Sequence, residues 1–315
     1  NVKDFNKLFW GDNLQVLSNL LKEYRGGIDL IYIDPPFDSK ADYVKKVKIR
    51  GEKVEGTGQG LFEEKQYTDI WEKDEYLQFM YERLLIMKEL LSNKGVLYLH
   101  CDWHKSAYLR LILDEVFGSD NFKNEIVWHY FVSGKYPNEF AKDHDNIFVY
   151  SKGENPTFNY EKQVDKNLYY EKSYNKQIVI GKDGKEYYEY NGELRTFEKQ
   201  VSETWNMNKI KRDGKEIVGY PTQKPEELLE RIIKASSNEG DVVADFFMGS
   251  GTTQVVAQRL GRKWIGCDIN IGSIQTATKR LNQIITDQQK EKTKNFKGSL
   301  GFKILNVNDY DVFKN

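Results

Sequence analysis

The apolar run at residues 28–33 ends at Asp34-Pro35-Pro36-Phe37, and this junction constrains the fold more than any other part of the chain. The run is rich in β-branched residues and has the length of a buried strand. Two successive prolines prevent its continuation. A carboxylate and an aromatic ring are therefore expected on a stiff turn at the carboxyl end of a strand, which is where ligands bind in open α/β sheets.

This turn has the chemistry to hold a base that carries an exocyclic amine. The carboxylate of Asp34 and a prolyl carbonyl can accept the two amine hydrogens, while the ring of Phe37 stacks on the face of the base. We therefore predict a catalytic site that consists of Asp34, Pro35, Pro36 and Phe37.

A second pattern of strand, glycine turn and helix lies at residues 241–260. Gly249 and Gly251 in its turn would let the backbone approach a ligand closely. The next predicted strand, at residues 263–267, ends in Asp268, and a carboxylate at that position can accept both hydroxyls of a ribose. The pattern predicts a site for a nucleoside cofactor.

These motifs, in this order, resemble those of the beta-class DNA amino-methyltransferases, and the chain is similar to the modification subunits of type III restriction systems. Phe246 stands where the family has proline. The resemblance implies an α/β, Rossmann-like methyltransferase fold with a doubly wound, mostly parallel sheet and an inserted target-recognition region. It covers most of the chain and rests on Gly11-Asp12-Asn13, Asp34-Pro35-Pro36-Phe37, residues 95–100, residues 221–225, residues 247–253 and residues 301–304.

The resemblance also implies S-adenosyl-L-methionine as the cofactor. Thr222 and Lys224 would bind the carboxylate of its methionine end, although a simple helix cap is an alternative for residues 221–225. The residues expected at the cofactor are Asp12, Asn13, Thr222, Lys224, Pro225, Asp245, Phe247, Gly249, Ser250, Gly251, Thr252, Thr253 and Asp268.

A metal site is not expected, although His100-Cys101-Asp102-Trp103-His104 brings two imidazoles and a thiol together. Closed zinc sites need a second ligand pair at a defined spacing, and the 4 histidines of the chain do not supply it. Polar residues at a strand end near an active site are the simpler interpretation.

DNA contacts have to come from local patches, because the formal net charge is only −1. We expect a mobile basic loop at residues 38–66 to lie across phosphates, although a solvated loop without this role fits equally well. In the insertion, aromatic and basic residues alternate, as on surfaces that contact nucleic acid, or as in a packed insertion without a ligand. The expected contacts are Lys40, Lys45, Lys46, Lys48, Arg50, Lys53, Tyr187, Tyr188, Arg195 and Trp205.

The motifs divide the chain into three parts. Residues 1–128 would form the catalytic half of the methyltransferase domain, residues 129–215 the target-recognition insertion, and residues 216–315 the cofactor-binding half. Cys101 and Cys267 are expected to be reduced core residues. With no apolar run long enough to span a membrane and a polar start unlike a signal peptide, a cytoplasmic protein is expected.

The expected activity is site-specific transfer of a methyl group to the N6 amine of a flipped adenine in double-stranded DNA. Asp at the first position of the tetrapeptide is usual for adenine-specific relatives, whereas Ser is more frequent in those that methylate the cytosine amine. Alternatives are the cytosine amine, adenine in RNA, a protein glutamine, and a DNA-binding partner subunit without activity. A dehydrogenase is disfavoured because the glycine turn lacks a third glycine. By the same resemblance we expect a homodimer, and a restriction or specificity subunit as a further partner.

Overall fold

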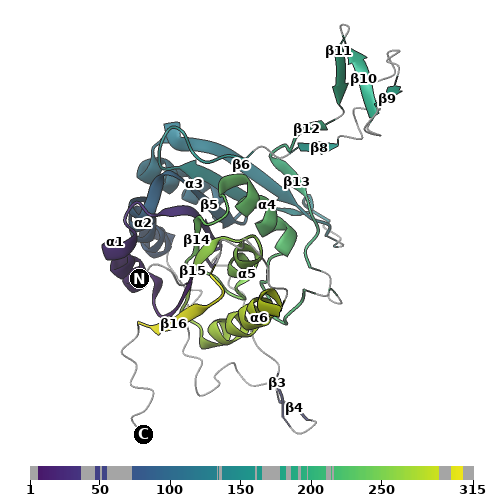
Figure 1. Cartoon of the computed structure of the whole chain (residues 1–315). Coiled ribbons are helices and arrows are strands. Elements are labelled where there is room, and N and C mark those ends of the chain that lie inside the picture. Colours follow the sequence, from purple (N-terminus) through teal and green to yellow (C-terminus); the bar gives the residue numbers. More distant parts are fainter. Residues whose placement is uncertain are drawn as a thin grey trace, which may run out of the picture.

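A central sheet with helices on both faces dominates the structure (Figure 1). The computed structural model describes residues 6–36, 47–49, 52–54, 73–132, 134, 137–159, 162–164, 178–181, 186–190, 193–196, 198–210, 214, 216–290 and 299–307. Within these residues the sheet has nine strands. Their order across the sheet is β13 (Thr204–Asn206), β6 (Phe122–His129), β7 (His144–Ser151), β5 (Leu91–Cys101), β2 (Ile28–Ile33), β14 (Val242–Asp245), β15 (Lys263–Asp268), β1 (Asn6–Trp10) and β16 (Phe302–Asn306).

The strands of this sheet run mostly in parallel. β7 is antiparallel to both β5 and β6, whereas the other neighbouring pairs are parallel. The predicted α/β fold with a doubly wound, mostly parallel sheet is confirmed.

Two helix layers bury the two faces of the sheet, as parallel sheets require. Successive residues of β2 alternate between the layers: Ile31 packs in the core of the first layer, and Leu30 and Tyr32 in that of the second. The first layer holds α1 (Asn13–Tyr24), α2 (Lys73–Leu90) and α3 (Ser106–Phe117), followed by the short 3-10 helix η2 (Ser119–Asn121). The second layer holds α4 (Glu226–Ser236), α5 (Thr252–Arg259) and α6 (Ile271–Lys290), which lie in front of the sheet in Figure 1.

The adjacent strands β2 and β14 mark the point where the chain changes direction across the sheet. From β2 it passes through α2 to β5 on one side, and from β14 through α5 to β15 on the other side. Crevices at the carboxyl ends of such strands are the usual ligand sites of doubly wound folds. Asp34 follows β2 and the glycine turn follows β14, so the two predicted sites meet here.

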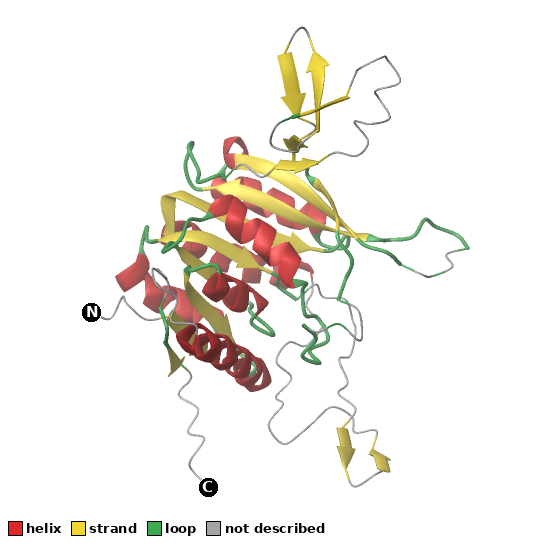
Figure 2. Ribbon diagram, turned by 45° about the vertical axis from the view of Figure 1, so that its right-hand side comes forward, coloured by secondary structure: helices red, strands yellow, loops and turns green. Residues whose placement is uncertain are grey.

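Short strands outside the main sheet form separate small units. In Figure 2 those of the insertion project away from the main sheet. The insertion holds a sheet of three strands, β9 (Ile178–Ile180), β10 (Glu186–Tyr190) and β11 (Glu193–Thr196), and the strand pair β8 (Lys162–Val164) and β12 (Glu198–Gln200). A hairpin outside the insertion consists of β3 (Val47–Ile49) and β4 (Glu52–Val54).

The predicted insertion boundaries at residues 129 and 215 were wrong. His129 is the last residue of β6, and β7 lies between β6 and β5 within the main sheet. β13 also belongs to this sheet and forms one of its two edges. The segment that leaves the sheet therefore lies between Ser151 and Thr204. No helix in the described part of the chain combines the length and the apolar character that crossing a membrane requires.

Candidate active site

The carboxylate of Asp34 lies at the carboxyl end of β2, on the face of the sheet that α4 covers. Its Oδ2 accepts a hydrogen bond from Nζ of Lys224, in the loop before α4, and the two side chains are 17% and 14% exposed. Its Oδ1 is buried and has no hydrogen-bond partner among the described residues. Buried acceptors are normally paired in proteins, so this oxygen is available to a donor from a ligand.

The rest of the predicted catalytic turn is only partly visible. Pro35 is buried and Pro36 is partly buried, and both continue directly from Asp34. Phe37 lies outside the described residues, so its role in stacking on a base stays a prediction.

The turn after β14 requires glycine at two positions. Gly249 and Gly251 have φ angles of 51° and 75°, which favour glycine. A Cβ at Gly251 would lie 2.7 Å from Cβ of Ala277 on α6, and one at Gly249 would lie 3.1 Å from the ring of Tyr220. The two glycines therefore allow the turn to pack closely against α6 and against Tyr220.

Two buried acids flank this turn. Asp268 accepts hydrogen bonds from the backbone N–H groups of Gly249 at 2.9 Å and Asn270 at 2.8 Å. Asp245 accepts from the N–H of Phe247 at 3.0 Å and from Oγ1 of Thr253 at 2.6 Å. Burial raises the pKa of Asp245 to about 7 and that of Asp268 to about 6. Together with Asp34, they place three carboxyl groups at this end of the sheet, which suits a ligand with a positive charge.

Asp245 and Thr253 are bonded to each other, so they hold the shape of the turn. We therefore interpret them as residues that support the predicted cofactor site without contacting the ligand. The groups expected to contact the ligand are the backbone of the glycine turn and Asp268.

The first segment of the chain is tied to the same turn. Asp12 caps α1 by accepting from the N–H groups of Leu14 and Gln15. Nδ2 of Asn13 donates to the carbonyl of Phe246 at 3.0 Å. Arg83 of α2 completes the cluster: its Nε donates to Oδ1 of Asn13 at 2.6 Å and its Nη2 to Oδ2 of Asp12 at 3.3 Å. The side chain of Asn13 thus bridges α2 and the glycine turn.

Arg280 on α6 is a further supporting residue that the sequence did not reveal. Its Nη1 donates to the carbonyl of Ser250 at 3.0 Å and to Oγ1 of Thr252 at 3.1 Å. Its Nη2 donates to Oε1 of Glu226, the first residue of α4, at 2.8 Å. This guanidinium connects the glycine turn with the start of α4.

The loop before α4 lies against the glycine turn. Tyr220 contacts Gly249 and its hydroxyl lies 3.2 Å from Oγ of Ser273 on α6. Gln223 donates to the carbonyl of Glu216 and accepts from the N–H of Val218. Of the predicted cofactor residues here, Thr222 is exposed, Pro225 occupies the N-cap position of α4, and Lys224 contacts Asp34.

A chain of buried polar groups runs behind Asp34. The hydroxyl of Tyr32 lies 2.9 Å from Nδ1 of His100, whose Nε2 lies 3.1 Å from Asp145, and Tyr130 donates to the same carboxyl group at 2.9 Å. Burial alone would raise the pKa of Asp145, but its contacts with His100 hold it below the usual value. Both ring nitrogens of His100 therefore have protein partners.

The structure describes only some of the predicted DNA contacts. Trp205 is a correction: it lies in β13 and is only 6% exposed, with its Nε1 donating to the carbonyl of Ser202. It packs in the core beneath Arg231, so it cannot reach a base edge. Tyr187 is partly buried in β10. Only the backbone is described at Tyr188 and Arg195, which are paired in β10 and β11, and at Lys48 and Lys53, which are paired in β3 and β4. Lys40, Lys45, Lys46 and Arg50, and most of the loop at residues 38–66, lie outside the described residues.

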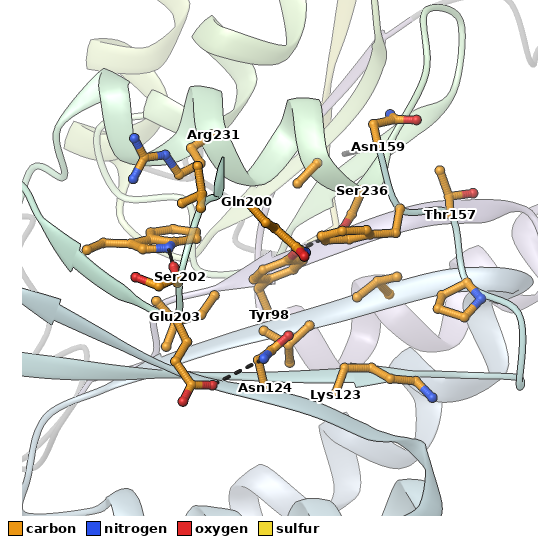
Figure 3. A pocket seen from close by; sticks show the side chains of 18 residues that line it. Tyr98, Lys123, Asn124, Thr157, Asn159, Gln200, Ser202, Glu203, Arg231 and Ser236 are labelled. Carbon is orange, nitrogen blue, oxygen red and sulfur yellow. Dashed lines mark hydrogen bonds between the residues drawn. The ribbon is translucent and has the colours of Figure 1, made fainter. Parts of the chain in front are cut away.

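A cavity of ≈ 320 Å³ lies away from this site (Figure 3). It is formed by the carboxyl end of α4, the middle of β5 and the amino-terminal part of β6, and Tyr98, Asn124, Arg231 and Ser236 are among its lining residues. The residues that follow β2 and β14 do not line it, so it is not part of the candidate active site.

Comparison with known proteins adds a family to this geometry. Residues 28–279 match a family model described as DNA methylase. The chain is 28% identical over 331 residues to the type II methyltransferase M.EcaI of Enterobacter cloacae, a match that covers 88% of this chain and 69% of that protein. It is 29% identical over 279 residues to the DNA adenine methyltransferase YhdJ of Escherichia coli, covering 86% of this chain and 81% of the relative.

A longer relative is the probable type III restriction-modification enzyme HindVI Mod subunit of Haemophilus influenzae. The identity is 25% over 403 residues, and the match covers 90% of this chain but 51% of the subunit. The chain thus spans about half the length of that relative.

Solved structures share the fold. The M1.HpyAVI–SAM complex superimposes with a TM-score of 0.54 at 20% identity, covering 88% of this chain and 98% of that one. The PvuII DNA methyltransferase, a cytosine-N4-specific enzyme, gives a TM-score of 0.56 at 18% identity, covering 97% and 96%. These similarities confirm the methyltransferase fold.

Proposed function

The chain belongs to the DNA methylase family, and we propose that it transfers a methyl group from S-adenosyl-L-methionine to the 6-amino group of adenine in double-stranded DNA, at a specific sequence. The observation that carries the proposal is the buried Oδ1 of Asp34, which has no hydrogen-bond partner within the described part of the chain, at the point where β2 meets β14. An acceptor at this place suits an amine that enters from the carboxyl edge of the sheet.

The residues present fit the proposed cofactor. The proposed ligand contacts are the backbone of the glycine turn and the carboxylate of Asp268, which accepts from the N–H of Gly249 and would accept the ribose hydroxyls of the cofactor. When bound, this cofactor supplies a methyl group on a positively charged sulfur that leaves as a neutral thioether. The acids Asp34, Asp245 and Asp268 favour that positive charge.

The protein's own contribution is placement of the amine. An aromatic amine is a weak nucleophile because its lone pair delocalises into the ring. Hydrogen bonds to Asp34 and to the carbonyl of Pro35 would favour a more tetrahedral nitrogen and aim its lone pair at the methyl group. Such alignment supplies much of the acceleration in bimolecular reactions. The extra proton can leave after the transfer, so Asp34 need not be a strong base.

The choice of adenine rests on Asp34 and on the relatives. Asp is usual at this position in adenine-specific family members, and the relative YhdJ is named as an adenine methyltransferase. The PvuII enzyme, named as cytosine-N4-specific, has the same fold, so the fold does not distinguish the two bases. Methylation of the cytosine amine is the competing outcome.

Contact with DNA would involve two segments. We propose that the basic residues of 40–53 contact phosphates and that Tyr187, Tyr188 and Arg195 of the insertion contact bases or backbone near the target. The target base has to leave the duplex to reach Asp34, and Phe37 is the proposed stacking partner. A homodimer and a separate restriction or specificity subunit also stay proposals, with the similarity to a Mod subunit as support for the second.

The test is methylation of duplex DNA with a labelled methyl donor, followed by mass spectrometry of the nucleosides. We expect methylated adenine from the unmodified protein and none from Asp34→Ala, which should still bind the cofactor. Asp29→Asn is the matched control, because Asp29 lies at the opposite end of β2 and bonds to Ser92 and Val242. Methylated cytosine as the product would contradict the choice of base, and substantial turnover by Asp34→Ala would contradict the role of the carboxylate.

A further inference from the structure

We propose that Lys224 couples the binding of the two substrates. Without cofactor, Lys224 occupies Asp34 and weakens its capture of the target amine. The carboxylate of the methyl donor then draws Lys224 away and frees Asp34. This inference rests on the proposed function, because it assigns the amine to Asp34 and the donor to the adjoining turn.

The first argument is the state of the Asp34 carboxylate. Nζ of Lys224 occupies Oδ2, while Oδ1 stays buried without a partner among the described residues. An ammonium group on one oxygen draws electron density from both, so the carboxylate is a weaker acceptor for an incoming amine. Both side chains are largely buried, so water screens their attraction only weakly.

The second argument is where the Lys224 side chain begins. Its loop is held against the cofactor turn by the contact of Tyr220 with Gly249 and by the contact between Tyr220 and Ser273. The loop is also fixed internally by Gln223. Lys224 therefore starts from a rigid position between the target acceptor and the cofactor turn.

The third argument is the nature of the side chain. Lysine carries a compact charge with three donors on a flexible stem of four carbons. It can turn from one carboxylate to another while its backbone stays in place. An arginine bound to Asp34 through two parallel hydrogen bonds would be harder to redirect.

The fourth argument is the balance of charge. A carboxylate that enters this crevice meets Asp34, Asp245 and Asp268, so it needs a cation, and Lys224 is at hand. Losing Lys224 leaves Asp34 as a partly buried carboxylate without its ion pair, which is unfavourable until a donor replaces it. The target amine supplies that donor. Binding of the two substrates is thereby coupled, and the coupling is the same in both directions.

The experiment measures binding and needs no turnover. Two duplexes carry the sequence methylated in the activity test, one with adenine at the target and one with purine, which lacks the amino group. Their dissociation constants are compared by fluorescence anisotropy with saturating S-adenosylhomocysteine or with saturating 5′-methylthioadenosine, which lacks the amino-acid part. With S-adenosylhomocysteine we expect the adenine duplex to bind on the order of tenfold more tightly than the purine duplex, because hydrogen bonds to a charged acceptor have about this effect. With 5′-methylthioadenosine we expect almost no difference between the two dissociation constants.

Two variants assign the effect to Lys224. In Lys224→Met the preference for adenine should be the same with either ligand, because Asp34 is free in both cases. Lys209→Met is the matched control: Lys209 is a nearby cation that lies over the ring of Tyr130, and its removal should preserve the difference between ligands. Calorimetry of both ligands with Lys224→Met sets the concentrations that keep the site saturated.

An equal adenine preference with both ligands in the unmodified protein would overturn the proposal, and so would a ligand difference that persists in Lys224→Met. Failure of the proposed function is recognised separately, by methylated cytosine in the activity test. In that case the same comparison is made with cytosine and its analogue without the amino group, and the role of Lys224 is decided by the same outcomes.

Discussion

The close contact at Gly251 gives a sharp test of how the cofactor turn is built. In Gly251→Ala the new methyl group would lie 2.7 Å from Cβ and 3.3 Å from Cα of Ala277. Cα belongs to the main chain of α6, and Cβ is the whole side chain of Ala277, so neither atom can rotate away. Either the turn or the helix has to move.

Two costs add up in this variant. The φ angle of 75° is in the left-handed region, where a residue other than glycine costs about 1–2 kcal/mol. Overpacking in a well-filled core adds about 1–3 kcal/mol. Gly240→Ala is the matched control, since Gly240 has a φ of 87° but nothing within 4 Å of the added Cβ. Only the conformational cost, about 1–2 kcal/mol, should appear there.

Urea unfolding of the two variants measures the difference, which we expect to be about 1–3 kcal/mol in favour of Gly240→Ala. Calorimetry should show weaker cofactor binding in Gly251→Ala alone, because its turn is displaced. The double variant Gly251→Ala/Ala277→Gly removes the overlap and should be more stable than the sum of the single changes predicts. Equal losses in the two alanine variants, or strict additivity in the double variant, would refute the steric argument.

Two further predictions concern the same site. The pKa of Asp268, raised to about 6 by burial, means that about a tenth of this group is ionised at pH 5, so cofactor affinity should rise about tenfold between pH 5 and pH 7.5 and then level off. Titration calorimetry across this range measures the rise, and Asp268→Asn should abolish the inflection; a flat profile in the unmodified protein would contradict the role of the carboxylate. Arg280→Met should lower the free energy of unfolding by about 2–3 kcal/mol and weaken cofactor binding, since it removes the buried guanidinium that donates to the Ser250 carbonyl, to Thr252 and to Oε1 of Glu226. Arg259→Met, which removes the more exposed partner of Glu226, should cost less than about 1 kcal/mol, and equal losses in the two variants would disprove the support of the turn by Arg280.

The strand ends and the glycine turn were predictable because their signals are local. Two prolines after an apolar run predict that the strand ends at Asp34. Glycines after residues 242–245 predict a turn, and two of them have positive φ angles in the structure. Since carboxyl ends of parallel strands share one edge of the sheet, these local signals sufficed to bring Asp34 and Asp268 into one site.

The errors arose where strand order across the sheet differs from order along the chain. β7 follows a stretch with a weak pattern, and its pairing between β5 and β6 is a long-range property. Trp205 was assigned to DNA because it lies among other aromatic and basic residues. Its pairing partner is Trp128 of β6, and this contact buries it. Composition cannot reveal such a partner.

Arg83 and Arg280 were missed for a related reason. Each lies within a helix, where an arginine normally marks the solvent face. Here each guanidinium points inward and donates to groups from other elements: Arg83 to Asp12 and Asn13, and Arg280 to Ser250 and Glu226. The helical pattern does not show which face these groups approach.

The contacts of Arg280 also connect the cofactor turn to the target side of the site. Glu226 accepts from Arg280 and stands only two residues after Lys224, whose ammonium group contacts Asp34. The same guanidinium holds Ser250 and Thr252. A displacement of the glycine turn would therefore be passed to the start of α4 and so to the base of the Lys224 side chain. For this reason a change such as Gly251→Ala is expected to disturb both the binding of the methyl donor and the ion pair that occupies the acceptor of the target amine.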